Sequence, residues 1–366
     1  MERFAFIIHP IDARRDVARK YPVARYLPVP CIEWFLKRHR PLCVAHVTGV
    51  RSVVGPEAEG WFIGCPLTPR QFLSLPVEDV YAKLVECGRI AEDLGARIIG
   101  LGAFTSVVGD GGATVASRLR IPVTTGNSYT VATAVQGAVR GADLMGVHLP
   151  QAMAAIVGAT GSIGATCAVM LGRLVGHLVL VGRDRVRLEA LADRIRPSLS
   201  TPTSVATDIA DGLRNADVVI TVSSATEAIV LPQHVKRGAV VCDVARPRDV
   251  SIAVARERDD VLVIEGGLVR VPGAMQCTSA SSGKPFSFGF PPGTAYACMS
   301  ETMALALEGR YESFTLGKDV SVEQADELAR LCDKHGFALD GFRSFERALS
   351  YDEVAAIRQR AGRPAS

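Results

Sequence analysis

The stretch Met153–Arg183 constrains the fold of this chain more than any other. It reads MAAIVGATGSIGATCAVMLGRLVGHLVLVGR. A short apolar run, Met153–Val157, precedes a glycine-rich turn over 158–164, a helical run continues to Leu174, and a second apolar strand, His177–Val181, closes the unit. A strand, glycine turn, helix and strand within about 30 residues are typical of a dinucleotide-binding half-fold. We therefore expect phosphates to bind the backbone N–H groups where this helix begins.

The glycine-rich turn supplies most of the candidate cofactor residues. One glycine allows the tight turn, one lets the backbone approach a pyrophosphate, and one lets helix and strand pack closely. The residues that we expect to hold the cofactor are Gly158, Thr160, Gly161, Ser162, Ile163, Gly164 and Arg183.

The residues after the second strand indicate which dinucleotide binds. Proteins that bind the unphosphorylated cofactor usually place Asp or Glu here, and its carboxylate accepts from a ribose hydroxyl. This chain has Gly182-Arg183 instead. The planar, charged guanidinium of arginine suits a 2′-phosphate, so we predict NADPH as the cofactor. Asp184 is the alternative, since it could be the ribose-binding acid displaced by one residue.

The surrounding elements predict the fold class. We expect a strand over 121–125 and then a helix from Asn127 to about Val139, with Gly141 as its stop. After Arg183, strands and helices alternate, which favours a doubly wound parallel sheet. The prediction is an α/β protein of two domains. Residues 1–147 would form an α/β substrate domain, 148–290 an NADP-binding Rossmann domain, and 291–366 C-terminal helices that pack back and complete the active-site cleft, with 273–292 as a loop.

Composition and charge exclude several classes of protein. The net charge of +3 argues against wholesale nucleic-acid binding, although residues 1–51 hold ten Lys and Arg against four Asp and Glu. That basic region is either a solvated face or a surface for an acidic partner. Nine cysteines without paired spacing argue against zinc and a disulfide framework and fit a reducing cytoplasm. We interpret the uncharged run 151–172 as a buried sheet unit, and expect no membrane span.

Cys298 is the cysteine with the strongest case for reactivity. It follows Pro291-Pro292-Gly293, near the start of an expected helix over 294–308. The N–H groups and partial positive charge of a helix start stabilise a thiolate, which is a strong nucleophile towards thioesters and aldehydes. From position alone, Cys298 could also be an unreactive packing residue, because cysteine is a common small core residue.

Several motifs, in order along nearly the whole chain, resemble those of the long-chain acyl-[acyl-carrier-protein] reductases of cyanobacteria. They are Gly102-Ala-Phe-Thr-Ser106, Thr124-Thr-Gly-Asn127, Val157-Gly-Ala-Thr-Gly-Ser-Ile-Gly164, Glu265-Gly-Gly-Leu-Val269, Ala297-Cys298 with the helix to Leu307-Glu-Gly309, and His335-Gly-Phe337. Residues 12–60, the loop 270–292 and the tail beyond Leu339 depart from that family. The nucleotide domain is also similar to shikimate dehydrogenase-type enzymes.

The resemblance implies a reaction and a set of site residues. Cys298 would carry the acyl group, and NADPH would reduce the thioester to a fatty aldehyde. The oxyanion needs hydrogen-bond donors, for which Thr105, Ser106, Thr125 and Asn127 are candidates. The partner would be acyl carrier protein or acyl-coenzyme A. Acyl length and oligomeric state stay open.

Two other functions remain as alternatives. One is an NADP-dependent dehydrogenase of a small polar substrate, by analogy with the shikimate-type layout. The other is a non-catalytic NADP-binding redox sensor, which would bind the nucleotide without turnover.

Overall fold

The computed structural model describes residues 1–18, 21–287 and 289–363, and these form two compact units. Unit 1 consists of Met1–Gly126, Val269–Asp319 and Arg330–Ala338, and unit 2 of Asn127–Leu268, Val320–Ala329 and Leu339–Ser366. Arg19, Lys20 and the last residues of the tail, 364–366, lie outside the described part. No described helix is long and apolar enough to cross a membrane.

This division differs from the expected one at 147/148 and 290/291. The helix that begins at Asn127 packs on the nucleotide sheet, so unit 2 starts about one helix earlier. Residues 269–319 belong to unit 1 because they add a strand and a helix to its sheet. The largest segment of unit 2, 127–268, is therefore inserted between two parts of unit 1, and the later segments of the two units alternate.

Unit 1 is built on a mixed six-stranded sheet in the order β13-β2-β3-β1-β4-β5. β1 pairs in parallel with β3 and β4, and β4 in parallel with β5, whereas β2 is antiparallel to β3 and to β13. The strands are β1 (Glu2–Ile8), β2 (Leu42–Arg51), β3 (Glu57–Gly64), β4 (Ile99–Gly100), β5 (Val123–Thr124) and β13 (Gly273–Ser279).

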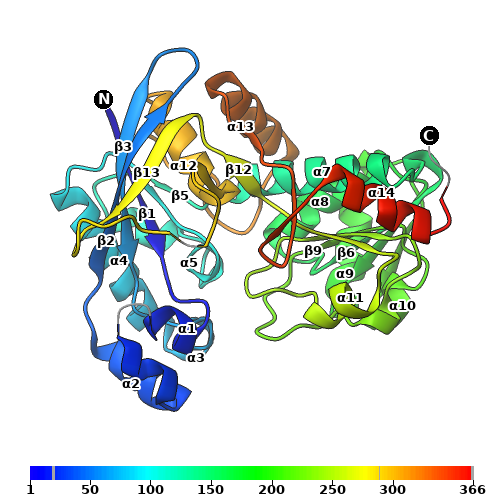
Figure 1. Ribbon diagram of the computed structural model, residues 1–366, viewed down its shortest axis with the longest axis horizontal. Helices are drawn as coiled ribbons and strands as arrows, with labels where there is room; N and C mark the ends of the chain where they lie inside the picture. The colour runs from blue at the N-terminus through cyan, green and yellow to red at the C-terminus, as the bar shows by residue number, and fades with distance from the viewer. Residues whose placement is uncertain (19–20, 288, 364–366) are drawn as a thin grey trace. The chain divides into compact units, whose positions relative to one another are not determined.

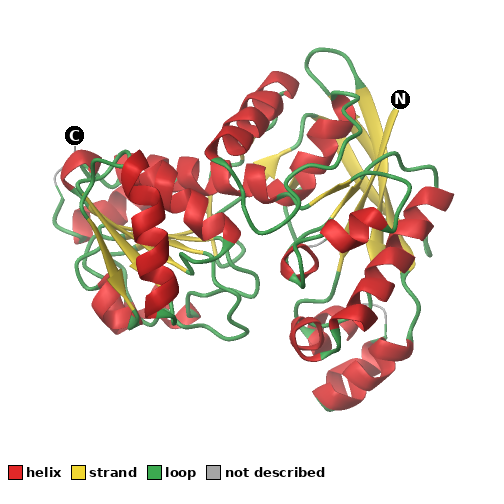
Figure 2. Ribbon diagram, turned by 180° about the vertical axis from the view of Figure 1, so that it is seen from behind, coloured by secondary structure: helices red, strands yellow, loops and turns green. Residues whose placement is uncertain are grey.

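Helices cover both faces of this sheet (Figure 2). Alternate residues of β1 point to opposite faces, so Ala5 and Ile7 join the core beneath α4, while Phe6 lies beside the helix α12. The helices of unit 1 are α1 (Ala13–Ala18), η1 (Pro22–Tyr26), α2 (Val29–Arg38), α3 (Pro69–Ser74), α4 (Val77–Asp93), α5 (Phe104–Val107), α6 (Ala113–Ser117) and α12 (Ala297–Leu307).

Unit 2 has a six-stranded sheet that is parallel throughout, in the order β11-β10-β9-β6-β7-β8. From β6 the chain adds β7 and β8 on one side, and it then crosses to the other side of β6 to add β9, β10 and β11. This is the strand order of a doubly wound Rossmann fold, as predicted. The strands are β6 (Met153–Val157), β7 (His177–Val181), β8 (Thr203–Ala206), β9 (Val218–Thr221), β10 (Val240–Asp243) and β11 (Leu262–Glu265).

Two apolar cores fill the faces of the unit 2 sheet. Ile156 and Leu180 face one core, whereas Val157 and Val181 face the other. The helices are α7 (Asn127–Leu144), η2 (Leu149–Gln151), α8 (Ser162–Gly172), α9 (Arg185–Ile195), η3 (Arg196–Ser198), α10 (Ile209–Leu213), η4 (Pro232–His234), α11 (Ile252–Glu257) and α14 (Tyr351–Arg360).

Shorter elements complete the chain. The helix α13 (Val322–His335) begins at the predicted capping box, in which Gln324 N donates to Ser321 Oγ at 3.1 Å and Ser321 N donates to Gln324 Oε1 at 3.1 Å. The remaining strands are β12 (Leu268–Arg270), β14 (Thr294–Tyr296), β15 (Ala338–Leu339), β16 (Phe342–Ser344) and β17 (Arg347–Leu349).

Two expectations about local structure were wrong. Gly141 does not end its helix, which continues to Leu144. A Cβ at Gly141 would lie 2.8 Å from Val240 Cγ1, so the glycine serves close packing of α7 on the sheet. The expected loop 273–292 contains β13, because the edge of β2 offers backbone groups with which Gly273–Ser279 pairs.

Candidate functional site

The glycine turn of unit 2 lies where β6 and β9 meet, at the point where the strand order reverses. Gly158 has φ +81°, a conformation that favours glycine, and a Cβ there would lie 2.9 Å from Ser223 N. A Cβ at Gly164 would lie 2.3 Å from Gly158 O, so the helix α8 packs directly on the turn. The carboxyl ends of strands at such a reversal are where open α/β sheets bind ligands.

The start of α8 has the features of an anion site. Gly161 is its N-cap and provides no side-chain hydrogen bond to the first turn. Gly161 is exposed, and Thr160, Ser162 and Ile163 are half-buried. The first-turn N–H groups are therefore not capped by the N-cap side chain, and the residues present fit a dinucleotide pyrophosphate.

The structure assigns Asp184 a local role. It is the N-cap of α9, and its Oδ1 accepts from Arg187 N at 3.1 Å. Arg183, directly before it, is exposed and makes no ion pair within the described part of the chain. The Asp184 carboxylate is therefore already engaged by the helix that follows β7.

Two buried carboxylates, Asp243 at the end of β10 and Asp249 in the loop that follows, escaped sequence reasoning. Asp249 accepts from Ser223 N at 2.8 Å and from Ser223 Oγ at 2.6 Å, and Asp243 accepts from Thr221 Oγ1 at 2.9 Å. Burial raises the pKa of Asp249 to about 6, and also raises that of Asp243. Asp249 thus fixes the Ser223 backbone against Gly158. For Asp243, the available signal was an acid at the end of a strand of a predicted parallel sheet.

Cys298 is the second residue of α12 in unit 1 and is half-buried. The N-cap, Tyr296, provides no side-chain cap. Two glycines crowd the cysteine: a Cβ at Gly102 would lie 3.3 Å from its Sγ, and a Cβ at Gly126 only 2.3 Å from its Cβ. Gly126 has φ +73°. The ends of β4 and β5 therefore meet the start of α12 at the thiol.

Other thiols are less suited to nucleophilic chemistry. Burial raises the pKa of Cys167 to about 12 and that of Cys277 to about 11. Cys87 and Cys332 are fully buried, and burial raises the pKa of Cys87 as well. Protonated thiols of this kind are poor nucleophiles.

Glu301 is the residue of the thiol site that sequence reasoning missed. It lies one helical turn after Cys298 and is fully buried. Its Oε1 accepts from the Thr124 hydroxyl, from Gly126 N at 3.2 Å and from Thr315 Oγ1 at 3.4 Å. The carboxylate therefore ties the end of β5 to α12. The signal was available, because Glu301 is the only charged residue in Ala297–Leu307.

The four candidate oxyanion donors differ in what they are bonded to. Thr105 Oγ1 donates to Gly102 O at 2.8 Å, Ser106 Oγ to Ala103 O at 2.8 Å, and Thr125 Oγ1 to Thr315 O at 2.6 Å. Asn127 is 2% exposed, and its Nδ2 has no hydrogen-bond partner within the described part of the chain. Since Asn127 directly follows Gly126, it is the candidate whose donor remains available.

The fold and the nucleotide site define the class of protein. A family described as shikimate / quinate 5-dehydrogenase matches residues 142–265, which include the glycine turn, Arg183 and all six strands of the unit 2 sheet. The chain is an oxidoreductase of the Rossmann kind that uses a nicotinamide cofactor.

Two relatives sharpen the comparison. The chain is 26% identical to the long-chain acyl-[acyl-carrier-protein] reductase of Synechococcus elongatus over 89% of the chain and 95% of that protein. This confirms the predicted resemblance. It is also 28% identical, over 85% of the chain, to the aminotransferase PigE of a Serratia species, but it spans only 36% of the length of that relative.

Solved structures resemble the chain more distantly. Glutamyl-tRNA reductase of Methanopyrus kandleri is 15% identical with a TM-score of 0.32, covering 77% of this chain and 56% of that one. The nucleotide-binding domain of the Thermoplasma volcanium glutamyl-tRNA reductase is 18% identical with a TM-score of 0.27, covering 36% and 84%. The described residues contain no group of three or more His, Cys, Asp or Glu placed to hold a metal ion.

Proposed function

We propose that this chain reduces a fatty acyl thioester to a fatty aldehyde with NADPH, through an acyl group held on Cys298. The observation that carries the proposal is the setting of Cys298. The thiol is half-buried at a helix start without a side-chain cap, and the ends of β4 and β5 reach it through glycines. The similarity to the acyl-[acyl-carrier-protein] reductase supports the choice of substrate.

In the acyl-transfer half of the reaction, the Cys298 thiolate attacks the thioester carbon. The carbon–sulfur bond to the carrier breaks, the carrier leaves as a thiolate that takes up a proton, and the acyl group stays on Cys298. The helix start stabilises the attacking thiolate, because its N–H groups and partial positive charge favour an anion. Asn127 Nδ2 is the donor that we assign to the oxyanion.

The residues of unit 2 would hold the cofactor. The turn Gly158–Gly164 receives the pyrophosphate and Arg183 the 2′-phosphate. NADPH supplies the hydride that converts the acyl carbon to the aldehyde oxidation level. Release of the aldehyde returns Cys298 as a thiolate, so the residue is regenerated for another cycle.

Acyl transfer without the cofactor tests the proposal. The protein is incubated without NADPH, either with acyl carrier protein that bears a fatty acyl group or with acyl-coenzyme A. It should release the carrier thiol and gain the mass of one acyl group on the Cys298 peptide. Later addition of NADPH should discharge that group as aldehyde. Cys31→Ser is the matched control, because Cys31 is exposed, whereas Cys87 and Cys332 are buried. NADPH binding with no adduct and no aldehyde would instead support the redox-sensor alternative.

A further inference from the structure

A surface at one end of unit 1 combines exposed apolar side chains with cations. It is formed by η1 and α2, which lie with α1 at the lower end of this unit in Figure 1. Tyr26 is 86% exposed, Trp34 and Val23 are each 61% exposed, and Phe35 is 41% exposed. Together with the exposed cations between them, the residues of this aromatic–cationic surface are Val23, Arg25, Tyr26, Trp34, Phe35, Lys37 and Arg38.

These apolar side chains are not needed to complete a core. The opposite face of α2 supplies Ile32 and Leu36, which pack with Val17, Ala18 and Ala24 into a small closed cluster. Successive residues of a helix are 100° apart, so Trp34, Phe35 and Arg38 share the outward face. A group of large aromatic side chains this exposed to water indicates a partner that covers them.

All the charged side chains of the aromatic–cationic surface are positive. Arg25, Lys37 and Arg38 make no ion pair within the described part of the chain, and the Arg38 guanidinium lies 4.1 Å from the Trp34 ring centroid. The only acid of η1 and α2, Glu33, points inward and pairs with Arg70. Other arginines of the basic N-terminal region are neutralised, as in the pairs Arg3–Glu59 and Arg40–Glu86.

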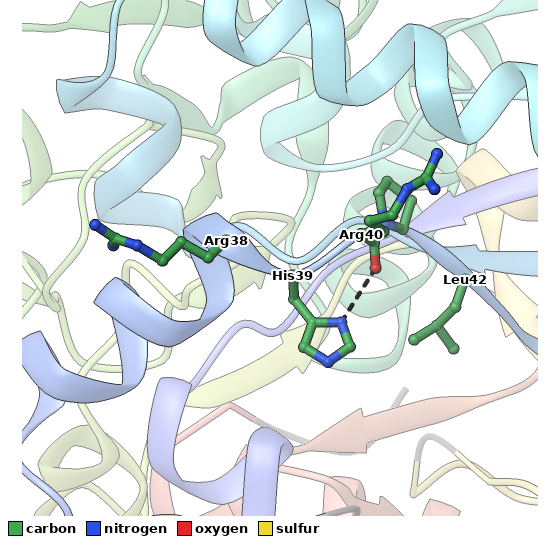
Figure 3. Close-up of a pocket in the computed structure, with 5 residues that line it drawn as sticks. Arg38, His39, Arg40 and Leu42 are labelled. Atoms are coloured by element: carbon green, nitrogen blue, oxygen red, sulfur yellow. Dashed lines mark hydrogen bonds between the residues drawn. The ribbon is translucent and has the colours of Figure 1, made fainter.

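The cations are spread out and do not converge on one point. A shallow hollow of about 380 Å³ lies beside α2, lined by Arg38, His39, Arg40, Pro41 and Leu42. Figure 3 shows the Arg38 and Arg40 side chains directed away from each other, and His39 Nδ1 lies 3.3 Å from Arg40 O. A single bound phosphate needs donors aimed at one place, so this arrangement suits an extended layer of negative charge.

We infer that the aromatic–cationic surface docks on an anionic lipid surface. Trp and Tyr are enriched where a bilayer meets water, and helices that lie in that interface carry aromatic side chains beside Lys and Arg. Each cation near an anionic membrane strengthens binding by about fivefold. A lipid headgroup layer also needs no shape-matched pocket for protruding rings, which a protein partner would have to provide. The inference is independent of the proposed reaction.

The two tryptophans of the chain allow a direct test. Trp34 lies in this surface, whereas Trp61 is half-buried in β3, with its ring stacked at 5.5 Å on His46. With vesicles of phosphatidylglycerol and phosphatidylcholine, the full chain should co-float, and its fluorescence should shift to shorter wavelength. Trp34→Phe should abolish the shift, while Trp61→Phe should keep it. A shift that persists in Trp34→Phe would overturn the inference.

Neutralising the cations provides the second arm. The triple variant Arg25→Gln, Lys37→Gln, Arg38→Gln should weaken vesicle binding by at least about a hundredfold. The matched variant Arg196→Gln, Arg214→Gln, Arg256→Gln changes net charge equally on exposed sites of unit 2 and should bind like the unmodified chain. Equal weakening in both variants, equal binding to pure phosphatidylcholine, or binding to an acidic carrier protein but to no vesicle would each overturn the lipid assignment. Circular dichroism of both triple variants checks that they fold like the unmodified chain.

Discussion

The nucleotide turn and the thiol site are assembled in different ways. In unit 2, β6, the turn Gly158–Gly164, α8 and β7 follow one another without interruption, and only Ser223 comes from elsewhere. In unit 1, the thiol site brings together Gly102, the end of β5, α12 and Thr315, which are far apart in sequence. The nucleotide turn depends on local backbone geometry, whereas the thiol site depends on long-range contacts made by one buried carboxylate.

The difference has a consequence for how each site responds to change. A single residue that disturbs the turn should affect nucleotide binding and leave acyl transfer intact. A substitution that disturbs the thiol site should impair acyl transfer and leave nucleotide binding intact. Variants that separate these two functions therefore test whether the sites are independent.

The largest expected effect is that of Cys298→Ser. Aldehyde formation should fall by about a thousandfold or more, because a hydroxyl without an activating base is a much weaker nucleophile than a thiolate. The size change is small, so NADPH affinity should be unchanged. Steady-state NADPH oxidation and equilibrium binding measure the two quantities. A variant that still reduces acyl thioesters at the original rate would show direct reduction of bound substrate, without an acyl-enzyme.

Gly158→Ala should disable the other site. The left-handed backbone of Gly158 and the approach of Ser223 leave no room for a Cβ, so we expect NADPH affinity to fall by about a hundredfold, or ~2.8 kcal/mol. Acylation of Cys298 without NADPH should continue at the original rate. Gly55→Ala controls for strain, since Gly55 has φ +113° and open space around it. Loss of acylation in Gly158→Ala would mean that the sites are coupled.

Arg183→Ala addresses the choice of nucleotide. A lost guanidinium–phosphate pair costs about 1.5–3 kcal/mol, so NADPH should bind roughly ten- to a hundredfold more weakly, while NADH affinity should hardly change. Titration of both cofactors into the variant and into Arg196→Ala as control provides the measurement. If the unmodified chain binds NADH as tightly as NADPH, Arg183 does not recognise a 2′-phosphate.

The smallest expected effect is that of Glu301→Gln. The amide keeps one acceptor oxygen but loses the charge that three donors share, so Cys298 acylation should slow by about fivefold, or ~1 kcal/mol. NADPH affinity should stay unchanged. Glu312→Gln, a surface change on the same segment of unit 1, is the control. An acylation rate equal to that of the control would limit Glu301 to a packing role.

The same contrast explains what the sequence could predict. The Rossmann domain could be predicted from the sequence because β6, the glycine turn and β7 are contiguous and their apolar pattern is unambiguous. The cap that Asp184 makes on α9 could be seen only in the structure. Gly141 was misread as a helix stop because its packing against Val240 depends on a strand a hundred residues away. β13 was missed for the same reason, since its pairing partner β2 lies far earlier in the chain.

The thiol site was predictable in part. Cys298 and the segments 102–106 and 124–127 were predicted to belong to one site, and Gly102 and Gly126 do lie against the thiol, but the candidate donors could not be ranked from the sequence. Whether a hydroxyl is already committed to a backbone carbonyl, as Thr125 is to Thr315, depends on tertiary contacts. Glu301 is neither a nucleophile nor a hydrogen-bond donor, but a lone charge in an apolar helix indicates a buried partner, and that signal is present in the sequence.

The insertion of residues 127–268 of unit 2 between two parts of unit 1 affects the order in which the chain can fold on the ribosome. When residues 1–126 emerge, the sheet of unit 1 still lacks β13 on its β2 edge and α12 on one face. Those pieces are synthesised only after β11, when the whole parallel sheet of unit 2 has been translated but its segments 320–329 and 339–366 have not. Both units are thus completed only near the end of translation, and until β13 and α12 have been made unit 1 presents an open strand edge and an uncovered apolar face. Slow translation through residues 127–268 therefore prolongs the time in which unit 1 is prone to aggregate, whereas all six strands of the parallel sheet of unit 2 lie within that stretch and need no later strand to pair with.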